Sequence, residues 1–213
     1  MDLNLVEDDE QEKAKQWWKE NRVPIISGIA LGIAIIAGFN WWEGYQRGRA
    51  ADASNLYQQL LNQDSDGDRT AAIETGNRLL ADFDDTPYSG KAALVLARIS
   101  YENKDKQAAV ERLNWVIENS AQFESKHAAR LKLANLYMAD KNYQQALDVL
   151  SVVHMEGFES HYFELRGDIY RHQGQHAKAR DAYRAAIDGL AAGSMYEPVL
   201  RMKLDSSPAG EDK

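Results

Sequence analysis

The sequence predicts an all-α protein in which a single transmembrane helix is followed by a solenoid of repeated helix pairs. Residues 23–42 form one long, uncharged and largely apolar run. Beyond it, apolar residues recur at intervals of three and four, the spacing of amphipathic helices, and small and large side chains repeat at a nearly constant interval. The length of 213 residues allows one domain of ordinary size and an appendage.

Composition and motifs argue against several classes of function. The formal net charge is −8, whereas a nucleic-acid-binding protein would carry a basic face. The chain has no cysteine, which excludes disulfides, thiolate metal sites and thiol catalysis. It also has no nucleophile elbow, phosphate-binding loop or dinucleotide fingerprint. We therefore expect a protein that is not an enzyme and that needs no metal or cofactor.

The uncharged run has the length of a membrane span. At about 1.5 Å per residue it reaches roughly 30 Å, the thickness of a bilayer's hydrocarbon core. Pro24 is expected near the start of this helix, where its missing N–H costs nothing, and the tryptophans at 17–18 and 41–42 suit the two interfaces. The run is longer than the apolar region of a cleaved signal peptide and lacks a small-residue cleavage site. We therefore expect an anchor.

Basic residues near the run predict its orientation. They are Lys13, Lys15, Lys19 and Arg22 before it, and Arg47 and Arg49 after it. Because the more basic flank stays in the cytoplasm, we expect a single-pass type II protein whose C-terminal part lies on the far side of the membrane, which in a bacterium is the periplasm. The predicted parts are an acidic cytoplasmic leader (1–22), the transmembrane helix (23–42), a periplasmic repeat domain (43–204) and a disordered tail (205–213).

Two glycines within the run are spaced for helix packing. Gly28 and Gly32 lie four residues apart, which lets a second transmembrane helix approach closely. We interpret them as a helix contact. The alternative is that glycine is simply common in transmembrane helices.

Nine helices are expected beyond the run, and no stretch alternates for long enough to predict a strand. The predicted ranges are 49–62, 69–83, 89–102, 106–119, 125–139, 143–153, 160–173, 177–192 and 196–204. The last helix is the candidate for closing the array, because the end of a solenoid needs a helix with a polar outer face.

Five positions repeat along three helix pairs. Ala97, Ala134 and Gly167 are followed at similar distances by Ser100, Tyr137 and Tyr170, by Ala109, Ala146 and Ala179, by Leu113, Leu150 and Tyr183, and by Val116, Val153 and Ala186. The steps of 37 and 33 residues lie close to the 34 of tetratricopeptide repeats. The small residues predict close helix crossings. A more degenerate unit with Ala53, Ala72, Gly76 and Leu79 precedes them.

Two motifs were weighed as metal sites. Residues 62–68 alternate oxygen-bearing side chains before a glycine, as at the start of a calcium loop, but Ile73 stands where that loop needs a glutamate. His172 and His176 are four apart, with Gly174 between them in a predicted turn. We favour a polar loop and turn residues, and whether residues 62–68 bind calcium stays open at this point.

The first helix of each pair lines the concave face of a solenoid, and we expect partner binding there. The three predicted rows are Leu94, Arg98 and Tyr101, then Leu131, Asn135 and Met138, then Glu164, Asp168 and Arg171. The first two rows are mainly apolar, which favours a groove for an extended or helical polypeptide. The alternative is that Leu94 and Leu131 are buried against neighbouring helices.

Several short motifs together resemble one family. They are KQWWKEN (15–21), FNWW (39–42), HMEGF (154–158), RGDIY (166–170) and GQHAKAR (174–180). On these motifs, and on the order of leader, anchor and alanine-rich repeats, the chain is similar over nearly its full length to the YfgM family. This family comprises ancillary subunits of the bacterial SecYEG translocon.

The resemblance implies a location in the cell inner membrane, with periplasmic repeats that associate with the SecYEG translocon and with a membrane-anchored periplasmic chaperone of the PpiD type. It also implies help in passing newly exported, unfolded proteins to periplasmic chaperones, and a leader that restrains the stress-response regulator RcsB. The family supplies no catalytic residues. A second interpretation stays open: an inner-membrane scaffold for cell-envelope assembly without unfolded clients, which a fixed charged site at Glu164, Asp168 and Arg171 would favour.

Replacing Gly28 and Gly32 together with leucine is expected to abolish detergent-stable association through the anchor, because the larger side chains would hold a partner helix away. Size-exclusion chromatography in a mild detergent measures this association. Unchanged association would remove the predicted contact.

Overall fold

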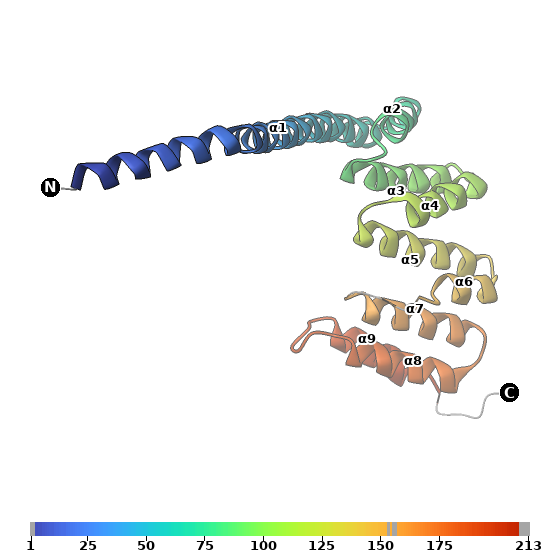
Figure 1. Cartoon of the computed structure of the whole chain (residues 1–213). Helices are drawn as coiled ribbons and strands as arrows, with labels where there is room; N and C mark the ends of the chain where they lie inside the picture. Colours follow the sequence, from blue (N-terminus) through green and yellow to red (C-terminus); the bar gives the residue numbers. More distant parts are fainter. Residues whose placement is uncertain (1–2, 153, 155–156, 209–213) are drawn as a thin grey trace. The chain divides into compact units, whose positions relative to one another are not determined.

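The computed structural model describes residues 3–152, 154 and 157–208, with side chains from residue 15 onward. All regular secondary structure in these residues is helical (Figure 1). The all-α prediction is therefore confirmed. The chain divides into two compact units, residues 1–49 and 50–213, and each is described separately below.

A single helix, α1 (Leu3–Ser65), runs through the predicted leader and anchor and through the helix expected at 49–62. Pro24 therefore lies inside a helix, and the prediction that it lies near the helix start is wrong. The leader is rich in Glu, Gln and Lys, which are good helix formers and extend the helix upstream. Proline removes the backbone hydrogen bond to the carbonyl of Glu20, and the rest of the helix tolerates this loss.

Among the described residues, one helix is long and apolar enough to cross a membrane. The apolar stretch of this helix is not buried against any other described part of the chain. Ile29, Ile35 and Phe39 are each about 60% exposed, and apolar surface on this scale needs a cover that the chain itself does not supply. At Gly28 and Gly32 an added Cβ would meet no atom within 4 Å, so both positions are open to a neighbouring helix.

The second unit is a stack of antiparallel helix pairs. The end of α1 packs with α2 (Arg69–Asp82), α3 (Pro87–Glu102) with α4 (Lys106–Asn119), α5 (Phe123–Ala139) with α6 (Tyr143–Val149), and α7 (Glu159–His172) with α8 (His176–Asp188). The short α9 (Glu197–Asp205) lies against α8 at the end of the stack (Figure 1). Helix α9 is thus the closing helix that the sequence predicts.

The small and large repeat positions form the cores between these helices. Ala97 and Ala134 are buried, and Gly167 is buried so closely that an added Cβ would stand 2.5 Å from the Tyr183 ring. Leu113 and Tyr183 are also buried in the corresponding second helices, and Leu150 is buried directly after the end of α6. The predicted close crossings are therefore confirmed, although Val153 lies outside the described residues.

The same turn joins the two helices of every pair. Gly67, Lys104, Lys141 and Gly174 all have positive φ, between 62° and 81°. In each turn the next residue donates its N–H to a carbonyl five positions earlier, at 2.8–2.9 Å. Asp68 and Asp105 then cap the following helix by accepting from the N–H of Ala71 and Ala108. The polar run at 62–68 is therefore the first copy of a repeated turn.

Two helices end well before their predicted ranges do. Helix α6 ends at Val149 and α8 at Asp188, each four residues early. At the end of α8, the backbone of Gly189 lies close to the start of α7, and a Cβ added there would stand 3.1 Å from the Ser160 nitrogen. This packing overrides the helix propensity of the alanines that follow Gly189. The ordered chain also continues past Leu204, because Ser207 is buried and its carbonyl accepts from Arg180 at 2.9 Å. Residues 209–213 of the predicted tail lie outside the described residues.

Gly167→Ala is expected to lower the free energy of unfolding by about 2 kcal/mol, because overpacking a core costs roughly 1–3 kcal/mol. The Tyr183 ring cannot retreat easily, since it is buried and its hydroxyl donates to Asp168 at 2.7 Å. Gly76→Ala is the matched comparison, because the three atoms nearest to its added Cβ all belong to the rotatable Leu96 side chain and not to a ring. Urea unfolding of the full-length protein in detergent, followed by circular dichroism, measures both, and an equal loss in the two variants would contradict the explanation.

Candidate partner-binding groove

The first helices of consecutive pairs enclose a hollow of about 320 Å³ between α3 and α5. It is lined by Ala97, Arg98, Tyr101, Leu113, Lys132, Asn135 and Leu136. Tyr101 is 44% exposed, so its ring offers a large apolar surface at the rim. The hollow therefore brings Arg98 and Tyr101 of the first predicted row together with Asn135 of the second.

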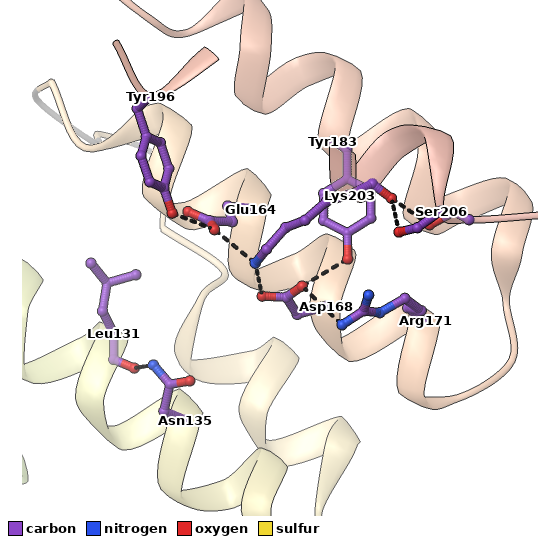
Figure 2. Close-up of polar contacts among 10 residues, drawn as sticks. Leu131, Asn135, Glu164, Asp168, Arg171, Tyr183, Tyr196, Lys203 and Ser206 are labelled. Atoms are coloured by element: carbon purple, nitrogen blue, oxygen red, sulfur yellow. Dashed lines mark hydrogen bonds and ion pairs between the residues drawn. The ribbon is translucent and has the colours of Figure 1, made fainter. Parts of the chain in front are cut away.

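A second hollow of about 230 Å³ lies between α5 and α7. It is lined by Leu131, Asn135, His161, Glu164, Leu165 and Asp168. Because Asn135 lines both hollows, they are neighbouring parts of one groove across α3, α5 and α7. The Asn135 amide donates to the carbonyl of Leu131 at 2.9 Å (Figure 2). Its side-chain oxygen has no donor among the described residues and is therefore available to a ligand.

Three of the nine predicted groove residues do not line either hollow. Leu94 packs against the core between α3, α4 and α5, and Met138 against the next core. Both residues lie where the groove-facing side of a helix meets the side packed on its neighbours, and a role for them in partner binding stays a prediction. Leu131 does both, since it packs against the core and also lines the second hollow. Arg171 pairs with Asp168 at 3.8 Å instead.

The charge of Arg98 is satisfied within the chain. Its guanidinium pairs with Asp64 at the end of α1 and donates to Glu102 at 2.9 Å. Glu102 also accepts from Arg69 at 2.6 Å. The hydrogen bond with Glu102, together with the contact with Asp64, raises the pKa of Arg98. Arg98 therefore contributes its alkyl stem to the groove, while Lys132 brings a cation that makes no ion pair with a described residue.

The third predicted row is neutralised by the closing helix. Lys203 of α9 lies 2.7 Å from both Glu164 and Asp168. The hydroxyl of Tyr196 donates to Glu164 at 2.8 Å, and that of Tyr183 donates to Asp168 at 2.7 Å. Figure 2 shows these groups converging from α7, α8 and the start and end of α9. The two carboxylates, which alone would attract a cationic partner, hold α9 in place.

The electrostatics of this cluster favour a protonated lysine and protonated tyrosines. Burial lowers the pKa of Lys203, but the hydrogen bonds and charges of Asp168 and Glu164 outweigh it, so the net pKa is raised. Burial and the hydrogen bond to Asp168 raise the pKa of Tyr183, and burial with the bond to Glu164 raises that of Tyr196. Folding therefore favours the protonated form of all three groups.

Sequence reasoning missed several residues of the groove. Lys132 and Leu136 follow Leu131 and Asn135 by one position, so the hollow takes in a wider part of α5 than a single row. Lys203 was missed because it comes from the closing helix. One signal was present: Lys203 follows Asp168 by 35 residues, nearly one repeat, as Arg98 follows Asp64 by 34.

The structure also clarifies the two motifs weighed as metal sites. Asp64 lies in α1 and pairs with Arg98, while Asp68 caps α2, so two of the calcium-like oxygens already have partners. His172 ends α7, where its ring stacks on Tyr143, and His176 begins α8. Among the residues with described side chains, no group of three or more His, Asp or Glu is placed to hold a metal ion.

Fold and groove define a class of protein: a helical-repeat solenoid whose first helices line a concave face. The family model described as a tetratricopeptide repeat-like domain matches residues 15–208, and the chain belongs to this family.

Curated relatives align with nearly the whole chain. A protein of Escherichia coli (strain K12) is 25% identical over 206 residues, with 97% of this chain and 98% of the relative covered. A protein of Haemophilus influenzae is 27% identical over 208 residues, with 97% and 100% covered. Both are named ancillary SecYEG translocon subunit, which confirms the resemblance drawn from the sequence motifs.

Solved structures share the fold. A putative kinesin light chain from Podosopora anserina, with nearly identical TPR-like repeats, has a TM-score of 0.53 and 19% identity, with 72% of this chain and 84% of that chain covered. MamA from Desulfovibrio magneticus RS-1 has a TM-score of 0.50 and 18% identity, with 75% and 89% covered. At these identities the likeness extends to the fold alone.

Lys203→Met is expected to destabilise the solenoid by about 2 kcal/mol, because it removes the cation that two partly buried carboxylates share and leaves Glu164 without an ion pair and Asp168 with only the more distant Arg171. Urea unfolding measures the loss, and hydrogen exchange should place it in α9. The control is Arg184→Met, which removes an exposed pair with Asp181 and should cost about 0.5 kcal/mol or less.

The stability difference between wild type and Lys203→Met is also expected to depend on pH, in a direction that the pKa of Lys203 defines. Because the folded-state pKa of Lys203 is raised, its contribution is complete below its ordinary value of 10.5 and is lost as pH rises through the folded-state value. This stability difference should therefore shrink as the pH rises through the folded-state pKa of Lys203. A difference that grows with pH would contradict the assignment.

Proposed function

We propose that this protein is a membrane-anchored adaptor that works beside the SecYEG translocon and binds partner proteins through the groove across α3, α5 and α7. Two observations support the proposal. Relatives that align with nearly the full length carry the name of an ancillary subunit of that translocon. The chain also combines an uncovered apolar helix with a helical-repeat domain.

The observation that carries the proposal is the hollow between α3 and α5. It is largely apolar, and it offers the ring of Tyr101, the amide of Asn135 and the amine of Lys132 at its edges. Such a surface suits polypeptide segments of varied sequence better than one fixed partner. The carboxylates of Glu164 and Asp168 are taken by Lys203, which weighs against the envelope-assembly scaffold, since that alternative relied on a free charged site.

In the fuller form of the proposal, α1 spans the inner membrane with the leader in the cytoplasm and the repeats in the periplasm. The repeats associate with a periplasmic chaperone of the PpiD type, receive newly exported, unfolded proteins and help transfer them to periplasmic chaperones, while the leader restrains the regulator RcsB. Anchoring raises the local concentration of the groove beside the translocon, so weak contacts suffice. The proposal assigns binding and no catalytic step.

Photocrosslinking in intact cells tests this function. A photoreactive residue at Tyr101 or Lys132 is expected to yield adducts with translocon subunits, the chaperone and exported chains, identified by mass spectrometry. Gln145, an exposed residue of α6 outside both hollows, is the matched control and should yield far fewer. Adducts limited to cell-wall or outer-membrane assembly proteins, with no translocon subunit, would overturn the proposal in favour of the scaffold.

A further inference from the structure

Arg112 of α4 is a half-buried cation without a carboxylate partner. Its guanidinium donates one hydrogen bond, to the side-chain oxygen of Asn77 on α2 at 3.1 Å. Its Nε is buried and has no acceptor, and it makes no ion pair with any described residue. An unpaired half-buried guanidinium is costly, and it is unexpected in a chain where 33 acidic residues outnumber 25 basic ones.

The two closest carboxylates are not placed to neutralise Arg112. Glu111 precedes it directly, and adjacent residues on a helix point in different directions. The Glu111 carboxylate instead accepts from Gln107 at 3.0 Å. Asp105 caps α4 by accepting from the N–H of Ala108 at 3.0 Å. Burial accordingly lowers the pKa of Arg112, although these two acids oppose the shift.

Arg112 lines a hollow that is separate from the groove. This hollow has a volume of about 290 Å³ and is formed by Leu80 of α2, Ala93 of α3, and Ala108, Glu111, Arg112 and Trp115 of α4. It shares no residue with the two hollows of the groove. Its walls are mostly apolar, including the Trp115 indole, and Arg112 is the only cation among them.

We propose that this hollow is a second binding site, which takes an aspartate or glutamate side chain of a polypeptide partner together with an apolar residue next to it. A guanidinium binds a carboxylate through paired hydrogen bonds, and the strength of such bonds rises where water is excluded. One carboxylate, that of Glu111, also lines the hollow, but it accepts a hydrogen bond from Gln107. The mostly apolar walls around the one cation match an acidic residue with an apolar neighbour, whereas a phosphate site would gather several cations. The proposal does not depend on the function assigned to the groove.

A tryptophan at the site allows a direct test with the full-length protein in detergent. Four of the five tryptophans lie at 17–18 and 41–42, and replacing those four with phenylalanine leaves Trp115 as the only indole. The probes are the N-acetylated, C-amidated tripeptide Leu-Glu-Leu and its Leu-Gln-Leu analogue. The glutamate peptide is expected to change the Trp115 emission saturably and to bind roughly tenfold more tightly than the glutamine peptide.

Three variants separate this site from the groove. Arg112→Gln should abolish the preference for the glutamate peptide. Ala108→Leu should weaken binding of both peptides by filling the hollow without touching the guanidinium, which keeps the test available if Arg112→Gln does not fold. Lys132→Gln removes the cation of the groove and should change nothing. The proposal is overturned if the two peptides bind equally, if Arg112→Gln keeps the preference, or if Lys132→Gln abolishes it.

Discussion

The close approach of the two helices within each pair is the constraint on which the rest of the solenoid depends. A short helix pair cannot bury its apolar faces alone, so it must present a well-defined face to the next pair. Where Gly167 meets the Tyr183 ring there is no room for a Cβ, and Ala97 and Ala134 hold the same place in the two preceding pairs. This approach sets how the pairs stack, and therefore where the first helices leave a groove.

Much of this architecture could be predicted because it follows from the spacing of small and apolar residues along the sequence. Small residues at crossings and large residues between pairs follow directly from helical spacing and from a repeat length. The turns within the pairs were harder to predict. Residues 62–68 looked like a separate loop because two of the four equivalent turns carry lysine, not glycine, at the left-handed position, as Lys104 and Lys141 show. The likeness of the turns lies in their backbone, and side-chain identity hides it.

The groove was predictable in position but not in its electrostatics. Arg98, Tyr101, Leu131, Asn135, Glu164 and Asp168 line it as the row pattern indicates. The state of its charges depends on residues far away in the sequence: Asp64 before the first turn and Lys203 in the closing helix. Those partners become visible only when the packing of whole helices is known. The outcome is a groove with satisfied charges at one end and an apolar hollow beside a free amine at the other.

The spacing of the polar contacts has a mechanical consequence. Arg98 with Asp64, Lys106 with Asp140, His127 with Tyr162, and Lys203 with Asp168 are separated by 34 or 35 residues. Each of these contacts joins one helix pair to the next, or, for Lys203 and Asp168, the last pair to the closing helix α9. A small change in the angle between neighbouring helix pairs at each contact therefore adds up along the array. Because the curvature of a solenoid follows from the small rotation between repeats, such changes would widen or narrow its concave side.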